Sequence, residues 1–213
     1  VMPEWPPSDR PAHIHADLNL EMRGYEFTTG HHLGLIDVGG PTDAGAPQLH
    51  GFFSPPRLPV FVRTARSFGW NWAGPPEPGS KGGPITDPPV TMIWMQTNPD
   101  EIIYLPDRLG GNIAAGTNYK ALVLYATQYR ITITYTARDN IAVGYALHLE
   151  NICVQPGLLA AYEWSNANGR RPLVALAPGQ AIGRAFGGQL GVIIRDVGAM
   201  MDPRVRKDWW KDY

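Results

Sequence analysis

Residues 129–154 read YRITITYTARDNIAVGYALHLENICV, and this stretch decides the fold. Apolar residues alternate with small or hydroxyl residues on both sides of a polar turn at 138–140. Because strand side chains point alternately to opposite faces, the pattern predicts two half-buried strands over 131–136 and 141–149. The bulky face is expected to face the core. The other face is small and ends at His148, which we expect either on the floor of a shallow groove or as a surface histidine on an exposed strand.

The rest of the chain fits the same class. Residues 156–162 predict a short helix, Pro178-Gly179 predicts the turn of a β-hairpin, and further strands are expected at 90–95, 102–105 and 119–125. Glycine (24) and proline (21) are abundant and helical periodicity is scarce. We therefore predict a mainly β fold, an antiparallel β-sandwich or barrel-like domain with long Gly/Pro-rich loops and little helix.

Three parts are expected along the chain. Residues 1–60 would form a His-rich β segment packed on the main domain, 61–100 a loop-rich insertion, and 101–213 the main β domain. The Gly/Pro-rich passage at 39–89 is too apolar for a disordered linker, so we expect ordered loops covering one side of the core.

Composition excludes several classes of function. The net charge is −1 without a basic run, which argues against nucleic-acid binding, and no apolar stretch approaches the length of a membrane span. The single cysteine, Cys153, excludes an internal disulfide and is expected to be a buried small hydrophobe. No nucleophile elbow, phosphate loop or dinucleotide motif is present.

Histidines cluster near the start of the chain. The segment AHIHADLNLEM (12–22) predicts a strand with His13 and His15 on one face, about 7 Å apart at Cα. His31, His32 and His50 follow, so a zinc or copper site is one interpretation. The alternative is that these imidazoles are simply solvated.

Two tryptophans form a second candidate site. Trp70 and Trp72 alternate with Asn71, an arrangement that would give an aromatic platform for stacking sugars. The alternative is that both are buried in the core.

Residues 101–203 resemble the lysostaphin-type zinc endopeptidase domain, which cuts peptidoglycan cross-links. EIIYLPDRLGGNI is similar to that family's "pV-apa-dG-V" opening, VGYALHLENI to its "vtyYaHLs-i" strand, and LAPGQAIGRAFGGQLGVIIRDVGAMMDP to its GQ-IG and HLHFE ending. The resemblance implies a β scaffold, a catalytic zinc, and a role for His148 as the additional active-site histidine.

The ligand set departs from that family's pattern. The late His-x-His falls on Gln189-Leu190-Gly191, and Gly191 has no side chain to bind a metal. GHHLGLID offers His32 and Asp37 for the early ligand pair, with a spacing one residue too long. The resemblance therefore implies an inherited scaffold that lacks a zinc ligand.

Two weaker resemblances concern the first half of the chain. HIHADLNLEMRGYEF is similar to a small His-rich β module of secreted or cell-envelope prokaryotic proteins. GHHLGLI is similar to a segment of copper monooxygenases, which carry a histidine where this chain has Thr127-Gln128.

Three functions follow as expectations. The first is a secreted or cell-surface module without catalysis, which binds cell-wall glycan or self-associates, with filament or envelope assembly as one variant. The second is an active zinc hydrolase of cell-wall peptide cross-links using His32, Asp37 and His148. The third is a His-cluster copper or zinc protein.

Overall fold

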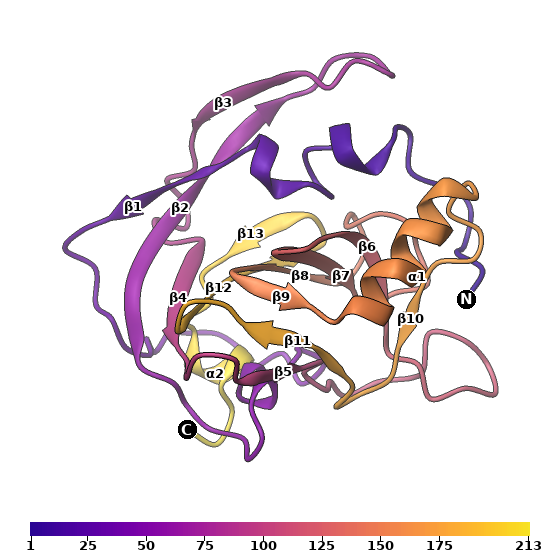
Figure 1. The fold of residues 1–213 in the computed structure, drawn as a ribbon. Helices are drawn as coiled ribbons and strands as arrows, with labels where there is room; N and C mark the ends of the chain where they lie inside the picture. Colours follow the sequence, from indigo (N-terminus) through magenta and orange to yellow (C-terminus); the bar gives the residue numbers. More distant parts are fainter.

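Antiparallel strands form two sheets that enclose the main hydrophobic core (Figure 1). The computed structural model describes all 213 residues. The large sheet has ten strands in the order β1-β2-β4-β12-β8-β7-β6-β10, with β13 paired to β12 and β3 paired to β2. The small sheet has the order β5-β11-β9. The predicted mainly β class is confirmed.

The strands of the large sheet are β1 (Tyr25–Thr28), β2 (Phe61–Asn71), β3 (Ser80–Pro84), β4 (Met92–Gln96), β6 (Ala121–Thr127), β7 (Arg130–Thr134), β8 (Tyr145–Glu150), β10 (Ala175–Leu176), β12 (Gln189–Asp196) and β13 (Ala199–Met201). Those of the small sheet are β5 (Ile102–Tyr104), β9 (Ile152–Val154) and β11 (Ala181–Ala185). The helices are α1 (Pro156–Ala167), α2 (Arg206–Trp209) and three 3₁₀ turns, η1 (Ala12–Ile14), η2 (Leu20–Met22) and η3 (Leu49–Phe52). No helix has the length and apolar character needed to cross a membrane.

The strands β7 and β8 pair as the alternation predicts, but β8 begins only at Tyr145, and Val143 of the predicted strand 141–149 is exposed. Ile133 lies opposite Leu147, and both belong to the main core together with Ile152 and Ile182 of the small sheet. On the other face Thr132 lies opposite His148, which in turn lies opposite Ile193 of β12. The bulky face therefore packs against the small sheet, as expected for a sandwich.

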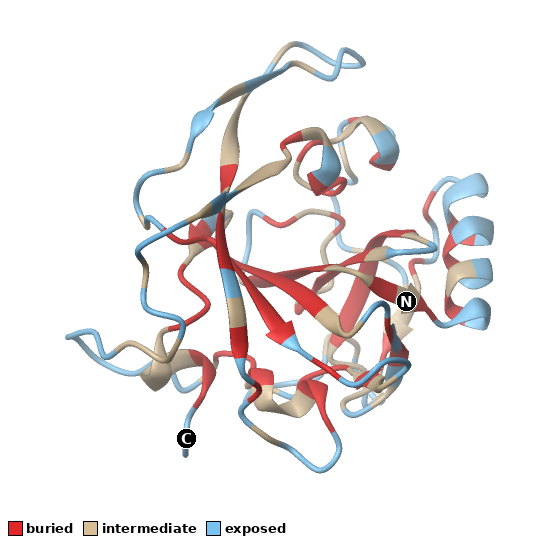
Figure 2. Ribbon diagram, turned by 60° about the vertical axis from the view of Figure 1, so that its left-hand side comes forward, coloured by how far each residue is buried: buried red, intermediate tan, exposed pale blue.

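The face that carries Thr132 and His148 is also buried, so the prediction of half-buried strands is wrong. Residues 12–24 cover this face: Leu20 packs in a small cluster with Ile193, and the Leu18 carbonyl accepts from Thr132 Oγ1. The central strands are consequently buried on both sides, whereas the outer surface of α1 is exposed (Figure 2).

The predicted strand at 12–22 is also wrong, because the segment forms the 3₁₀ turns η1 and η2. Its alternating apolar residues Ala16, Leu18 and Leu20 are buried as predicted. The alternation correctly indicates which side chains point inward. It does not distinguish a strand from a segment of short turns that buries the same side chains.

Two further expectations fail. The expected loop-rich insertion at 61–100 contributes β2 and β4 to the large sheet, where β4 pairs directly with β12. The Pro178-Gly179 turn does not close a hairpin, since β10 pairs with β6 and β11 pairs with β5 and β9. Strands from all three parts of the chain thus lie in one sheet.

Candidate functional site

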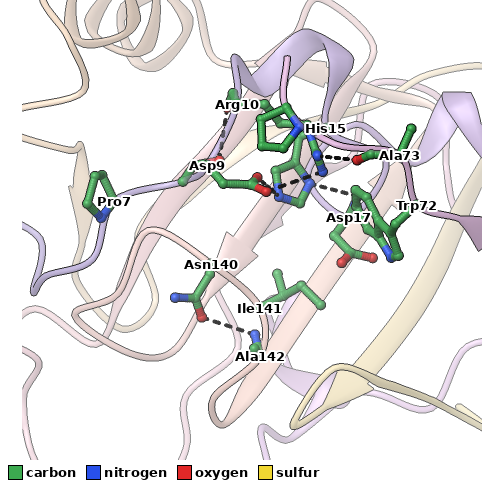
Figure 3. Close-up of a pocket in the computed structure, with 12 residues that line it drawn as sticks. Pro7, Asp9, Arg10, His15, Asp17, Trp72, Ala73, Asn140, Ile141 and Ala142 are labelled. Carbon is green, nitrogen blue, oxygen red and sulfur yellow. Dashed lines mark hydrogen bonds and ion pairs between the residues drawn. The ribbon is translucent and has the colours of Figure 1, made fainter. Parts of the chain in front are cut away.

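An open cleft of about 470 Å³ lies where three distant segments meet (Figure 3). Residues 7–17 form one side, the stretch after β2 supplies Trp72 and Ala73, and the turn at 140–142 closes the opposite side. We call it the Trp72 cleft. The side chains in its lining that could recognise a ligand are Asp9, Arg10, His15, Asp17, Trp72 and Asn140.

The indole of Trp72 forms the aromatic wall of the cleft and is 45% exposed. The Arg10 guanidinium lies over the ring, 4.9 Å from its centroid, and the His15 imidazole meets it edge-on at 5.2 Å. Arg10 is itself buried and donates from Nη2 to the Ala73 carbonyl at 2.8 Å. These contacts hold the indole rigidly at the surface, so a ligand would meet a preformed platform.

Trp70 supports this wall from behind. Its ring lies 6.4 Å from that of Trp72 at an angle of 68°, and its Nε1 donates to the Pro78 carbonyl at 2.7 Å. Trp70 is half-buried and does not line the cleft. The two tryptophans therefore do not form a flat double platform, because they pack edge to face.

His15 connects the aromatic wall to two carboxylates. Its Nδ1 accepts from the Asp17 backbone N–H at 3.2 Å, and its Nε2 lies 3.4 Å from Asp9 Oδ1. Burial lowers the pKa of His15, although Asp17 and Asp9 act in the opposite direction. The ring is therefore neutral at pH 7, with its proton on Nε2 facing Asp9.

Asp17 binds two buried arginines through one oxygen. Its Oδ1 accepts from Arg23 Nη2 at 2.5 Å and from Arg195 Nη1 at 2.6 Å, while Oδ2 makes no hydrogen bond within the chain. Burial alone would raise the pKa of Asp17, but Arg195 and Arg23 outweigh it and lower that pKa. Asp17 thus stays ionised and keeps one oxygen free for a ligand.

The other predicted metal ligands lie apart. His13 is exposed, Asp37 accepts from Arg206 Nε at 2.8 Å, and the ring of His50 lies 5.2 Å from that of Tyr213. His31 and His32 lie in the loop after β1. No three His, Cys, Asp or Glu side chains come close enough together to hold a metal ion. His13 and His15 diverge because η1 rotates them to different sides.

His148 does not lie in a groove, which corrects its expected position. It is fully buried, and its Nδ1 lies 2.9 Å from Thr132 Oγ1, which donates to the Leu18 carbonyl at 2.7 Å. Thr132 Oγ1 therefore accepts from Nδ1–H, and Nε2 is left without a partner. Burial, reinforced by Arg195, lowers the pKa of His148 to about 3.

Gly191 is closely packed, and a side chain there would require the flexible end of Met92 to move. A Cβ there would lie 2.5 Å from Met92 Cε and 3.2 Å from Glu150 Cβ and Trp94 Cε2. The resemblance to zinc endopeptidases implies that the second histidine of the late His-x-His motif, which is the one that binds the metal, would stand at this position. An imidazole would require the side chains of both neighbouring strands to move.

Gly191→Ala is expected to lower the free energy of unfolding by about 1–3 kcal/mol, because the added methyl overpacks the sheet face. Chemical denaturation measures this change. Gly83→Ala in β3 is the matched control, since a Cβ there meets nothing within 4 Å. Equal stability of the two variants would contradict the close packing around Gly191.

Comparison with known proteins found no matching family model, no matching curated protein and no matching solved structure. The site is therefore interpreted from its geometry.

Two of these six side chains of the Trp72 cleft were predicted from the sequence as functional residues, each for a different reason. His15 was predicted as a metal ligand and Trp72 as a sugar platform, and the fold brings them into contact. Asp17 shares the polar set of the HIHAD segment with His15 and could have been included. No sequence motif pointed to Asp9, Arg10 or Asn140, because only the tertiary fold brings them close to Trp72.

Proposed function

We propose that this protein is a carbohydrate-binding module without catalytic activity, and that the Trp72 cleft is its binding site. The observation that carries the proposal is the 45% exposed indole of Trp72, which is packed by Arg10 and His15 and lies beside unused polar atoms. The C–H face of a sugar ring packs on an aromatic ring, while its hydroxyls need hydrogen-bond partners around the rim.

The rim of the cleft offers such partners. The Asp9 side chain is 53% exposed, and Asp17 Oδ2 is unused. Asn140 uses its Oδ1 to accept from the Ala142 backbone N–H at 3.1 Å, which leaves its NH₂ group free to donate. Two acceptors and one donor around an aromatic wall suit a neutral sugar with several hydroxyls or an acetamido group.

Two observations support the absence of catalysis. His148, the histidine for which the family resemblance implies an active-site role, is sealed beneath residues 12–24. Gly191, where the family resemblance implies a metal-binding histidine, has no side chain and is closely packed by Met92, Glu150 and Trp94. The proposed setting is the cell envelope or the extracellular space, where glycan of the wall would be the ligand.

Trp72→Ala is expected to weaken binding of a soluble N-acetylglucosamine oligomer at least tenfold, which corresponds to about 1.4 kcal/mol of binding free energy. Isothermal titration calorimetry with the tetramer measures the affinity, and sedimentation with insoluble cell-wall glycan measures retention.

Trp164→Ala is the matched control, because Trp164 is 58% exposed on α1 and does not line the cleft. Equal affinity of the Trp72→Ala variant and the wild type would refute the site. Failure of the wild type to bind both the oligomer at millimolar concentration and the wall preparation would refute the function.

A further inference from the structure

A second and larger cleft, of about 840 Å³, is lined by α1, by the end of β6 and by all three strands of the small sheet. We call it the α1 cleft. Its volume falls within the range of small-molecule sites, about 300–1,000 Å³. None of its lining residues belongs to the Trp72 cleft.

Most of the cleft wall is apolar. The apolar side chains come from β5, β6, β9, α1 and β11, and they are Ile102, Ala126, Val154, Pro156, Leu159 and Ala181. Along α1 the lining extends from Pro156 to Glu163, eight residues that span about 10 Å of helix. This wall is long enough for a medium-length alkyl chain.

Hydrogen-bond donors gather where β9 passes into α1. Arg184 lies directly opposite Cys153 and uses only Nη1, which donates to the Asp100 carbonyl at 3.0 Å. Gln155 accepts from the Leu158 N–H through Oε1, so its NH₂ group is free. The Gln128 side chain makes no hydrogen bond, and its carbonyl accepts from the Val154 N–H at 3.0 Å.

The charge at this end of the cleft is positive. Arg184 donates only to a backbone carbonyl and forms no ion pair, and the nearby Glu101 carboxylate is bound by Arg57 at 2.8 Å. The amino end of α1 adds partial positive charge. Glu163, which has no ion-pair partner, lies two turns further along α1. A negative group is therefore favoured beside Arg184 and disfavoured beside Glu163.

We propose that the α1 cleft binds an amphipathic monoanion, with a carboxylate on Arg184 and an alkyl chain along Val154 and Leu159. The charge at each end sets the direction of the ligand. The site is independent of the proposed glycan site.

Decanoate, used below its micelle-forming concentration, is the probe, and calorimetry gives its affinity. We expect Arg184→Gln to weaken decanoate binding about tenfold and Glu163→Gln to strengthen it two- to fivefold. Both substitutions neutralise one exposed charge on the cleft wall. General damage to the cleft would weaken binding in both variants, whereas electrostatic recognition predicts affinity changes of opposite sign. Decanol, which has the same chain without the charge, should bind the wild type at least tenfold more weakly than decanoate.

Cys153 reports where the probe binds, because it is half-buried, not fully buried as expected from the sequence, and it lines the cleft. Saturating decanoate should slow its alkylation by N-ethylmaleimide at least fivefold, measured by mass spectrometry. Arg171→Gln, an exposed arginine outside the cleft, and Trp72→Ala should leave decanoate binding unchanged. Unaltered alkylation of Cys153, or equal affinity for decanoate and decanol, would overturn the proposal.

Discussion

Acidification from pH 7 to pH 4 is expected to lower the free energy of unfolding of the wild type by about 3 kcal/mol more than that of a His148→Gln variant. The unfolded imidazole takes up a proton near its ordinary pKa of about 6.5, whereas the folded ring does so only at about 3. Between these values the unfolded state binds more protons, so this contribution to stability is complete above pH 6.5 and is lost as the pH falls. Denaturant titrations at pH 7, 6, 5 and 4 measure the difference.

The comparison between the two chains isolates His148 from the other buried groups. Burial raises the pKa of Glu150 to about 7, despite the nearby Arg130, so its contribution to stability falls as the pH rises towards 7. That opposing dependence is present in both chains and cancels in the difference. His13→Gln, which changes an exposed histidine, should follow the wild type. Parallel curves for wild type and His148→Gln would show that the ring is accessible to protons in the folded state.

The sequence predicted the centre of the fold better than its covering parts. Alternation around Ile133 and Leu147 located β7 and β8 and the core side of both. It could not show that the opposite side, with Thr132 and His148, is covered as well. That cover comes from residues 12–24, more than one hundred positions away along the chain. Its backbone forms short turns, which a two-residue alternation of apolar side chains does not predict.

The strand β2 illustrates a different reason for failure. Its sequence FVRTARSFGWN mixes arginines and hydroxyl residues with apolar ones and is followed by a Pro/Gly-rich loop. Arg66 pairs with Glu26 of β1, and Arg63 lies over the Phe27 ring, so these arginines are partnered across the sheet. These cross-strand partners stabilise β2. They lie elsewhere in the sequence, so the local composition of the strand does not reveal them.

Asp17→Ala is expected to destabilise the protein by about 3–5 kcal/mol, the largest effect among single changes in the Trp72 cleft. The carboxylate is the shared counter-ion of Arg23 and Arg195, which are both buried. Its removal leaves two guanidinium groups without a compensating charge. Asp9→Ala is the control, because that carboxylate is half exposed and both of its ion-pair contacts, to Arg10 and His15, are as long as 3.4 Å, so its loss should cost less than about 1 kcal/mol.

The same carboxylate links the two predictions argued here. Arg195 belongs to β12 and Arg23 to the covering segment 12–24, so Asp17 joins that segment to the sheet above His148. If the ion pairs hold the cover in place, Asp17→Ala should loosen it and let water reach the imidazole, and the pKa of His148 should rise towards 6.5. The direct loss of the Asp17 charge acts in the opposite direction, since Asp17 raises the pKa of His148 whereas Arg195 and Arg23 lower it, so a rise would report opening of the cover. NMR titration of the His148 ring in this variant measures the change. A destabilised variant whose His148 still resists protonation below pH 4 would show that the apolar contacts of Leu18 and Leu20 keep the cover closed without Asp17.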